Sequence, residues 1–171
     1  MPFDERGKLI YYEVVASNET PKDSLISRAL AFLEADSKKF KISAIKGDTL
    51  VEATGKMLIS KSALGMARPM GAVDYSFYTE VKAGKYRFWL TDFVFVSYMR
   101  DRYGNFVPET TIGIPLEREQ GKLRVAEWVG YQKITAREAK AIADQFKTAL
   151  ATRIYTLQSK KPKNTISTKK W

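Results

Sequence analysis

The first half of the chain alternates apolar and polar residues in several short stretches, a pattern that predicts β-strands. Residues 7–16, "GKLIYYEVVA", predict the first strand, and residues 39–60 predict two strands joined by a tight turn at Lys46–Thr49. Residues 60–72 contain Pro69 and several small residues, which predicts a loop. The turn places the apolar residues of the paired strands on one face of a sheet. The expected pairs on that face are Phe40–Gly55, Ile42–Ala53 and Ala44–Val51.

Two other stretches repeat apolar residues at intervals of three and four, which predicts amphipathic helices. The first follows Thr20, a suitable N-cap, and Pro21, which fits the first helical position. The second runs to Leu157 and starts with Thr135, which forms a capping box with Glu138. The apolar faces consist of Leu25, Ile26, Ala29, Leu30, Phe32 and Leu33 in the first helix, and of Ala139, Ile142, Phe146, Ala149, Leu150 and Ile154 in the second.

The stretch from 75 to 95, "YSFYTEVKAGKYRFWLTDFVF", holds eight aromatic residues, and Ala83–Gly84 is its turn candidate. Because the side chains of a strand alternate between its two faces, a hairpin at this turn divides them into two sets. The set expected to face the helices consists of the pairs Val81–Tyr86, Thr79–Phe88, Phe77–Leu90 and Tyr75–Asp92. The set expected on the opposite face consists of the pairs Lys82–Lys85, Glu80–Arg87 and Tyr78–Trp89.

Tyr78 and Trp89 are therefore expected on the face that the helices leave open, where large exposed aromatic groups often mark a binding surface. Glu80 and Arg87 lie beside them as a favourable cross-strand ion pair. These four residues, Tyr78, Glu80, Arg87 and Trp89, are the candidate binding site.

Residues 92–132 decide how open that face is. Phe93 and Phe95 join it if the strand is regular and leave it if a bulge intervenes. A buried Asp92 could act as an acid or base, whereas a bulge would bring it to solvent or to backbone amides. Residues 99–132 hold short β-like pieces at 110–114 and 123–129, and predict an additional hairpin or a long ordered loop. Such an insertion, folded back, would cover the aromatic pair.

The order of predicted elements is strand, helix, four strands, an insertion and a long helix. Hairpin connections favour antiparallel pairing, and helices with one apolar stripe must bury it on one face of the sheet. The pattern thus predicts a two-layer α+β domain over residues 1–157, followed by a flexible basic tail at 158–171.

Three segments together resemble a bacterial family of unknown function, found mainly in Bacteroidetes, with a TATA-binding-protein-like (TBP-like) fold. They are "GKLIYYEVV", "SLISRALAFLEA" and "YSFYTEVKAGKYRFWLTDF" within residues 5–98. The resemblance implies a curved antiparallel sheet with two helices on its convex side and a concave open face. It brings no catalytic residue or ligand, and it favours the periplasm or cell envelope. The matching positions are Gly7, Lys8, Tyr11, Lys82, Gly84, Lys85, Tyr86, Arg87, Asp92 and Phe93.

The amino-acid composition excludes several kinds of catalytic and metal-binding site. The chain has neither Cys nor His, which removes disulfides, thiolate nucleophiles, His-dependent triads and most zinc sites. No run is apolar enough for a membrane helix, and the N-terminal "MPFDERGKL" lacks the apolar core of a signal peptide. That leaves open whether a signal was removed by processing. The net charge is +10, and half of it lies in residues 158–171.

These observations favour a non-catalytic module that needs no cofactor or metal and binds a protein, peptide or small amphipathic ligand on the open concave face. The sequence is also compatible with three alternatives. The basic, aromatic sheet face could bind nucleic acid, although Glu52 and Glu80 lie on it. The sheet and long helix could enclose a lipid as a helix-grip carrier. An enzyme would have to use carboxylates or Tyr.

Overall fold

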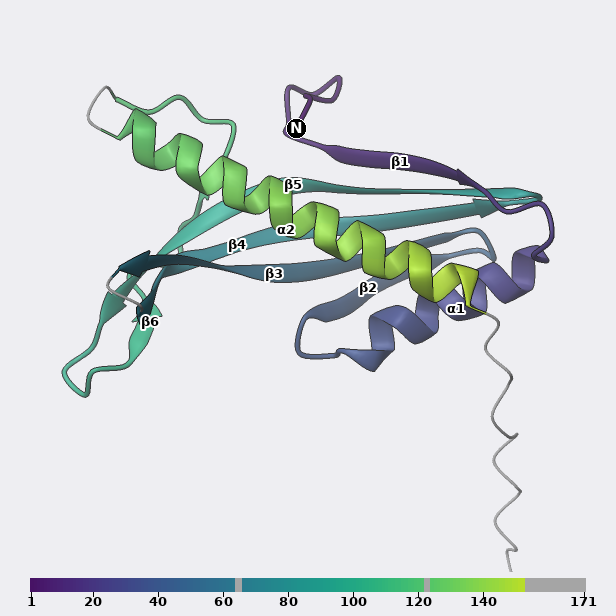
Figure 1. Cartoon of the computed structure of the whole chain (residues 1–171), viewed down its shortest axis with the longest axis horizontal. Helices are drawn as coiled ribbons and strands as arrows, with labels where there is room; N and C mark the ends of the chain where they lie inside the picture. The colour runs from purple at the N-terminus through teal and green to yellow at the C-terminus, as the bar shows by residue number, and fades with distance from the viewer. Residues whose placement is uncertain (64–65, 122–123, 153–171) are drawn as a thin grey trace, which may run out of the picture.

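The computed structural model describes residues 1–63, 66–121 and 124–152. Seven strands form one antiparallel sheet in the order β1-β5-β4-β3-β2, with the short β6 and β7 paired to β5 (Figure 1). The structure confirms the predicted α+β class and element order. The elements are β1 (Tyr11–Ala16), α1 (Lys22–Ala35), β2 (Phe40–Lys46), β3 (Leu50–Ala63), β4 (Met66–Lys82), β5 (Lys85–Arg100), β6 (Phe106–Pro108), β7 (Ile114–Pro115) and α2 (Val125–Ala151).

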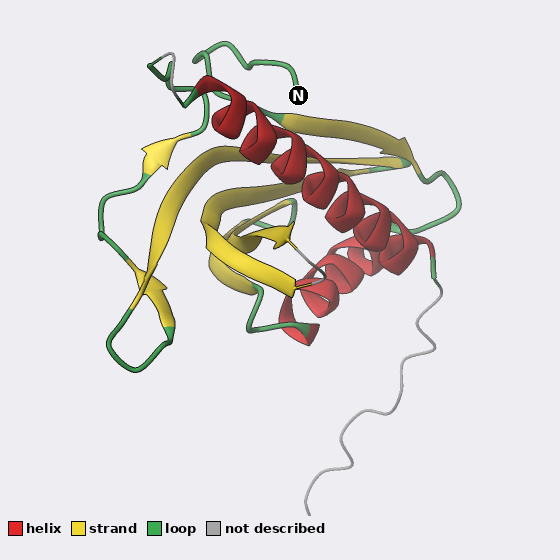
Figure 2. Ribbon diagram, turned by 60° about the vertical axis from the view of Figure 1, so that its left-hand side comes forward, coloured by secondary structure: helices red, strands yellow, loops and turns green. Residues whose placement is uncertain are grey.

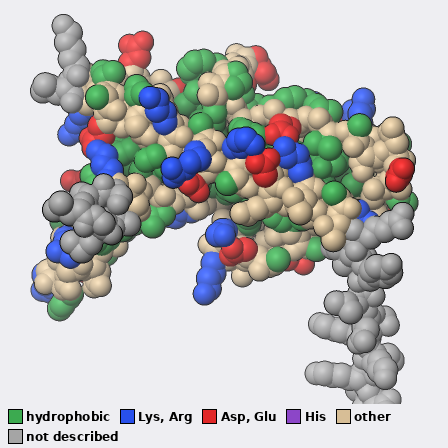
Figure 3. All heavy atoms as spheres, in the orientation of Figure 1, with side chains coloured by type: hydrophobic (Ala, Val, Ile, Leu, Met, Phe, Trp, Pro, Cys, Tyr) green, Lys and Arg blue, Asp and Glu red, His purple; other side chains and the backbone are tan. Residues whose placement is uncertain are grey.

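The two helices lie on the same side of the sheet, whose long strands curve along their length (Figure 2). Viewed from the helix side, basic and acidic side chains are interspersed over the exposed surface of α2 (Figure 3). The centre of the buried layer is Phe146 of α2, whose ring lies 5.0–6.1 Å from the rings of four aromatic neighbours. These neighbours are Phe32, Phe77, Tyr86 and Phe88.

The β4–β5 hairpin has the predicted register from its turn to Phe77–Leu90, with Tyr78 opposite Trp89. The predicted pair Tyr75–Asp92 is wrong, because the register shifts between Asp74 and Ser76. Asp92 has a φ of 54°, the left-handed conformation of a residue at a bulge. The extra residue moves the side chains that follow it in β5 to the opposite face of the sheet.

That bulge settles the placement of the two phenylalanines after it. Phe93 and Phe95 are both buried in the core rather than on the open face. Asp92 itself is partly exposed, and its Oδ1 lies 3.6 Å from Arg6 Nη1. Because a bulge adds one residue to only one strand, all side chains beyond it change face.

The β2–β3 hairpin departs from prediction in a similar way. Phe40–Gly55 and Ile42–Ala53 pair as expected, but a register shift follows Ile42 and places Ala44 opposite Glu52 instead of Val51. The turn is one residue longer than predicted, since Lys46 pairs with Leu50 rather than Thr49.

The loop predicted at residues 60–72 is wrong. β3 and β4 continue as a paired hairpin to Ala63 and Met66, with Pro69 accommodated at a register shift next to Ser60. Proline cannot donate a backbone hydrogen bond, so it is tolerated at irregularities, where the regular ladder of hydrogen bonds is already interrupted. The small residues Ala63, Ala67 and Gly71, which suggested a loop, are therefore part of two long strands.

Helix α1 begins at Lys22 with Pro21 as its N-cap, one residue later than predicted. Its expected apolar face is confirmed, with Leu25, Ala29 and Leu33 buried against the sheet. Arg28 of α1 donates a hydrogen bond to the Leu150 carbonyl near the end of α2 (2.6 Å). A cation suits this end of a helix, where carbonyls lack helical partners.

Helix α2 begins ten residues before the predicted capping box. Residues 123–129 were expected to be β-like, but the helix starts at Val125, and Thr135 is fully buried in its interior. The predicted stripe of Ala139, Phe146 and Leu150 is buried as expected. Ile154 and the tail at 158–171 lie outside the described residues.

The Thr135 hydroxyl is buried without a hydrogen-bond partner among the described residues. We expect Thr135→Val to raise the free energy of unfolding by about 1 kcal/mol, because valine keeps the shape and removes an unpaired polar group. Urea denaturation measures this. Thr79→Val is the matched control: Thr79 is also fully buried but donates to the Arg87 carbonyl, so this variant should be destabilised. A loss of stability in Thr135→Val would contradict the prediction.

Candidate binding groove on the open sheet face

Tyr78 and Trp89 stack against each other on the sheet face opposite the helices. Their ring centroids are 5.1 Å apart and their planes differ by 12°. Both side chains are half-buried. They come from neighbouring strands, β4 and β5, at directly opposite positions, so the hairpin register alone brings them together.

Glu80 and Arg87 occupy the next pair along the same two strands. The Arg87 Nε donates to Glu80 Oε2 at 2.5 Å, and the Arg87 Cζ lies 5.3 Å from the centre of the Trp89 ring. This combines an ion pair with a cation–π contact. The structure therefore brings together all four residues predicted as the candidate site.

The charges of this pair are mutually stabilised. Burial opposes ionisation of Glu80, but the hydrogen bonds and charges of Arg87 and Lys82 together outweigh this effect and lower the pKa of the carboxyl. The pKa of Arg87 is raised first by a hydrogen bond with Tyr12 and then by Glu80. Tyr12, on β1, thus belongs to the same cluster although the sequence did not indicate it.

The N-terminal segment forms a wall of a groove beside the aromatic pair. The groove has a volume of about 620 Å³. Its floor is the open face, and Pro2–Arg6 rise along one side. The lining residues are Pro2, Asp4, Glu5, Arg6, Ile10, Tyr12, Tyr78, Arg87 and Trp89.

Polar contacts hold this wall in place. Asp4 accepts hydrogen bonds from the backbone N–H groups of Arg6 and Lys8, at 2.9 and 2.8 Å. The Arg6 guanidinium bridges Asp4 and Asp92, so the bulge residue serves as an anchor. Lys8 Nζ lies 2.5 Å from Glu117 Oε1. A short Asp-x-Arg-Gly turn is therefore tied to the sheet and to the insertion.

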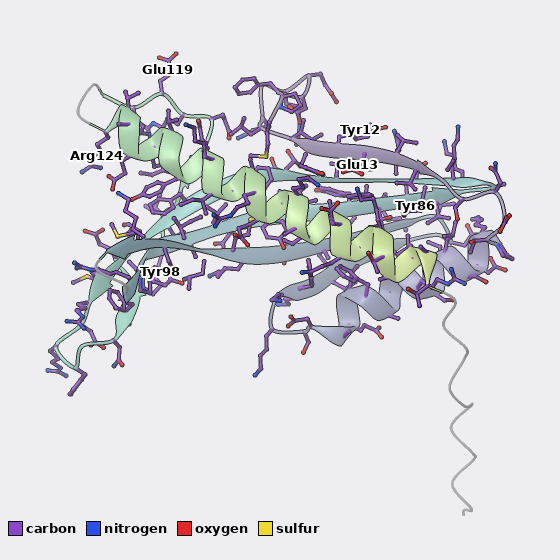
Figure 4. All side chains as sticks on the ribbon, viewed as in Figure 1. Tyr12, Glu13, Tyr86, Tyr98, Glu119 and Arg124 are labelled. Atoms are coloured by element: carbon purple, nitrogen blue, oxygen red, sulfur yellow. The ribbon has the colours of Figure 1, made fainter. Side chains whose placement is uncertain are left out.

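The insertion at 99–132 does not line this groove in the part of the chain that the structure describes. Its strands β6 and β7 pair with β5 beyond the bulge, and its last residues begin α2. In Figure 4, Tyr98, Glu119 and Arg124 lie at the end of the molecule away from Tyr12 and Tyr86. The expected cover of the aromatic pair is thus replaced by a wall from the N-terminal segment.

The same geometry bears on acid–base chemistry at Asp92. Its carboxylate is partly exposed and ion-paired with Arg6, which is the alternative that the sequence left open, and not a buried catalytic acid. Among the described residues, no three Asp or Glu side chains are arranged to hold a metal ion. None of the helices in the described ranges has the length and apolar character that crossing a bilayer requires.

The fold and open-face groove define an α+β domain of the TBP-like type. A family model described as a domain of unknown function (DUF4468) with TBP-like fold matches residues 11–96, about half of the chain. The chain belongs to this family.

Two solved structures have the same fold. A DUF4468 family protein from Bacteroides ovatus ATCC 8483 superimposes with a TM-score of 0.65 at 13% identity, covering 88% of this chain and 90% of that one. A TBP-like protein from Parabacteroides distasonis ATCC 8503 gives 0.65 at 12% identity, covering 87% and 96%. No curated protein matches the chain. The two structures confirm the fold, and together with the family model they support the Bacteroidetes family of unknown function that the sequence motifs had indicated.

Proposed function

We propose that this chain is a non-catalytic binding module whose open-face groove holds an amphipathic ligand. The observation that carries the proposal is the stacked Tyr78–Trp89 pair, which neither α1 nor α2 covers and which lies in a groove of about 620 Å³. Ligand sites combine apolar and aromatic walls with a few polar groups that orient the ligand. Here the two aromatic rings form the apolar wall, and Arg6 and Arg87 are the polar groups that would orient the ligand.

The charges of the groove favour a neutral or zwitterionic ligand over a nucleic acid. Its lining has two basic side chains, Arg6 and Arg87, and two acidic ones, Asp4 and Glu5. Binding to a phosphate backbone requires an excess of cations along its path. The +10 charge of the whole chain therefore does not describe this surface.

The helix-grip alternative is less well supported, because aromatic side chains fill the centre of the space between α2 and the sheet. Between α2 and the strands, the described residues leave pockets of only about 290 and 240 Å³. Phe146 is fully buried and packs on Phe77 and Phe88 with centroid distances of 5.1 and 5.0 Å. A carrier needs an enclosed cavity in that position. The proposal therefore places the ligand on the opposite face of the sheet.

We expect small molecules that combine one ring with one charged or hydroxyl group to shift the Trp89 indole N–H signal in NMR spectra. Replacing both Tyr78 and Trp89 by alanine should weaken binding of any such molecule by about 30-fold or more, as for aromatic residues at the centre of an interface. Isothermal titration measures the affinity of each hit for both proteins.

Tyr103→Ala is a matched control, since Tyr103 is an exposed aromatic beside an arginine, with Arg102 Cζ 5.0 Å from its ring. This residue lies in the 99–132 insertion, outside the groove. Circular dichroism verifies that the variants remain folded. Equal affinity of the double variant and the unmodified protein would rule out this face as the ligand site.

A further inference from the structure

Strand β1 forms one edge of the sheet, next to β5 (Figure 1). The Ser17 N–H donates to the Gly84 carbonyl at 2.8 Å, continuing the β1–β5 ladder. In an antiparallel ladder, hydrogen-bonded pairs alternate with non-bonded pairs. The odd-numbered residues of β1 therefore bond to β5, and Tyr12, Val14 and Ala16 direct their N–H and C=O groups outward. No partner for these outward groups exists among the described residues.

The chain itself already uses the beginning of this edge. The Ile10 N–H, next in the outward series, donates to the Pro2 carbonyl at 3.0 Å, and Phe3 forms an antiparallel bridge with Leu9. The N-terminal segment thus pairs along the edge for a short distance and then leaves it. Beyond Ile10, the outward groups of Tyr12, Val14 and Ala16 continue the same series along the edge.

The other edge of the sheet is built differently. β2 carries Lys41 and Lys46 and a register shift after Ile42, the devices that usually block the pairing of edge strands. β1, "YYEVVA", has no lysine, proline or bulge. Its one charge, Glu13, is held at 2.8 Å by Lys147 on the helix side. One edge is therefore protected and the other is not.

Along the free edge, the surface is apolar at Tyr12 and Val14 and becomes basic near Ala16. Tyr12 and Val14 are 47% and 55% exposed on the open face. Ala16, which is small, lies opposite Lys85, and Lys85 lies opposite Lys82. Lys82 Nζ lies 3.5 Å from Glu80 Oε1, whereas Lys85 has no ion-pair partner among the described residues. A carboxylate placed beside Ala16 would give Lys85 an opposite charge.

We propose that β1 is a docking edge for an extended acidic segment of another protein, which joins the sheet as an additional strand. Backbone hydrogen bonds to Tyr12, Val14 and Ala16 would supply affinity, as in other cases of strand addition. Apolar side chains would lie beside Tyr12 and Val14, and an Asp or Glu would lie beside Ala16 and reach Lys85. A second copy of this chain fits less well, because two chains of net charge +10 repel each other.

A displayed library of random eight-residue peptides tests this directly. The unmodified protein should enrich peptides in which two apolar residues and one acidic residue alternate with unspecified positions. Val14→Pro should abolish that enrichment, because proline removes the central outward N–H without breaking a bond to β5.

A selected peptide, made synthetically, then gives two independent measurements. On the isotope-labelled protein it should shift most strongly the backbone amide signals of Val14 and Ala16, which do not line the aromatic groove, together with that of Tyr12. This result stands even if Val14→Pro folds poorly. Lys85→Glu should weaken its binding by about fivefold, whereas Lys41→Glu, the same charge change at the opposite edge, should leave it unchanged.

The proposal is overturned if no peptide is enriched, if the enriched peptides bind Val14→Pro equally, or if the amide shifts centre on the aromatic groove instead. Dimerisation that Val14→Pro abolishes, without peptide enrichment, would assign the edge to a second copy and also overturn it. The inference does not rest on the proposed function of the groove. The double variant of Tyr78 and Trp89 should keep the docking edge intact, so the two ideas can fail separately.

Discussion

Replacing Phe146 by alanine is expected to lower the free energy of unfolding by about 3–5 kcal/mol, the usual cost of removing a large buried aromatic ring. Phe146 is fully buried, and its ring packs edge-on against the rings of four neighbours from α1, β4 and β5. These neighbours come from different elements and cannot all move together into the vacated volume. The free-energy cost of the unfilled cavity should therefore add to the cost of losing the buried apolar area.

Urea denaturation followed by circular dichroism measures this effect. Val129→Ala is a control on the same helix, because Val129 is 39% exposed and its truncation should change stability by less than about 0.5 kcal/mol. A loss below about 1.5 kcal/mol in Phe146→Ala would show that the core closes around the gap, and that Phe146 is not its centre.

Gly55→Ala is expected to destabilise the protein by about 1–3 kcal/mol, because the site has no room for a methyl group. A Cβ at Gly55 would lie 2.3 Å from Cζ and 2.4 Å from Oη of Tyr75, whose ring covers this glycine from the neighbouring strand. Tyr75 is itself buried, at 3% exposure, so its ring cannot move outward freely. Denaturation midpoints measure the loss.

Gly130→Ala is the matched substitution with the opposite expected sign. Nothing lies within 4 Å of a Cβ at Gly130, which is inside α2, so alanine should raise stability by about 0.5–1 kcal/mol. In a double-mutant cycle, Tyr75→Leu should remove part of the cost of Gly55→Ala, since leucine lacks the atoms in conflict. Additive effects would show that the Tyr75 ring is not the cause.

Much of the candidate site followed from one short-range signal. The turn at Ala83–Gly84 sets the register of β4 and β5, and Gly84 has the positive φ of 73° that favours glycine. Once the turn is placed, strict alternation puts Tyr78 opposite Trp89 on the open face. A two-residue turn and a period of two thus suffice to predict a stacked pair eleven residues apart.

The errors arose where one residue breaks that alternation. Asp92 and the residue after Ile42 occupy register shifts, and beyond each of them the predicted faces are reversed. The left-handed conformation of Asp92 is compatible with the local sequence, but so is a regular strand. The ion pair with Arg6, 86 positions away, belongs to the tertiary fold and has no local signal.

Thr135 shows that a local sequence signal can also mislead in a helix. Its sequence neighbourhood matches a capping box, yet residues 125–134 continue the helix upstream, where Trp128 and Tyr131 pack against Phe95. The burial of these rings stabilises ten further helical residues and places a capping residue in the interior. Tertiary packing outweighs a local preference of about 1 kcal/mol.

Local periodicity and one turn are enough to predict the two-layer α+β class, the face that each helix buries and the pairing of Tyr78 with Trp89. Long-range contacts, in contrast, make the N-terminal segment, rather than the insertion, the wall of the groove. They also bring Tyr12 into the cluster and leave one edge of the sheet unpaired among the described residues. These features depend on contacts between residues far apart in the chain, such as Arg6 with Asp92 and Lys8 with Glu117, for which no local pattern exists.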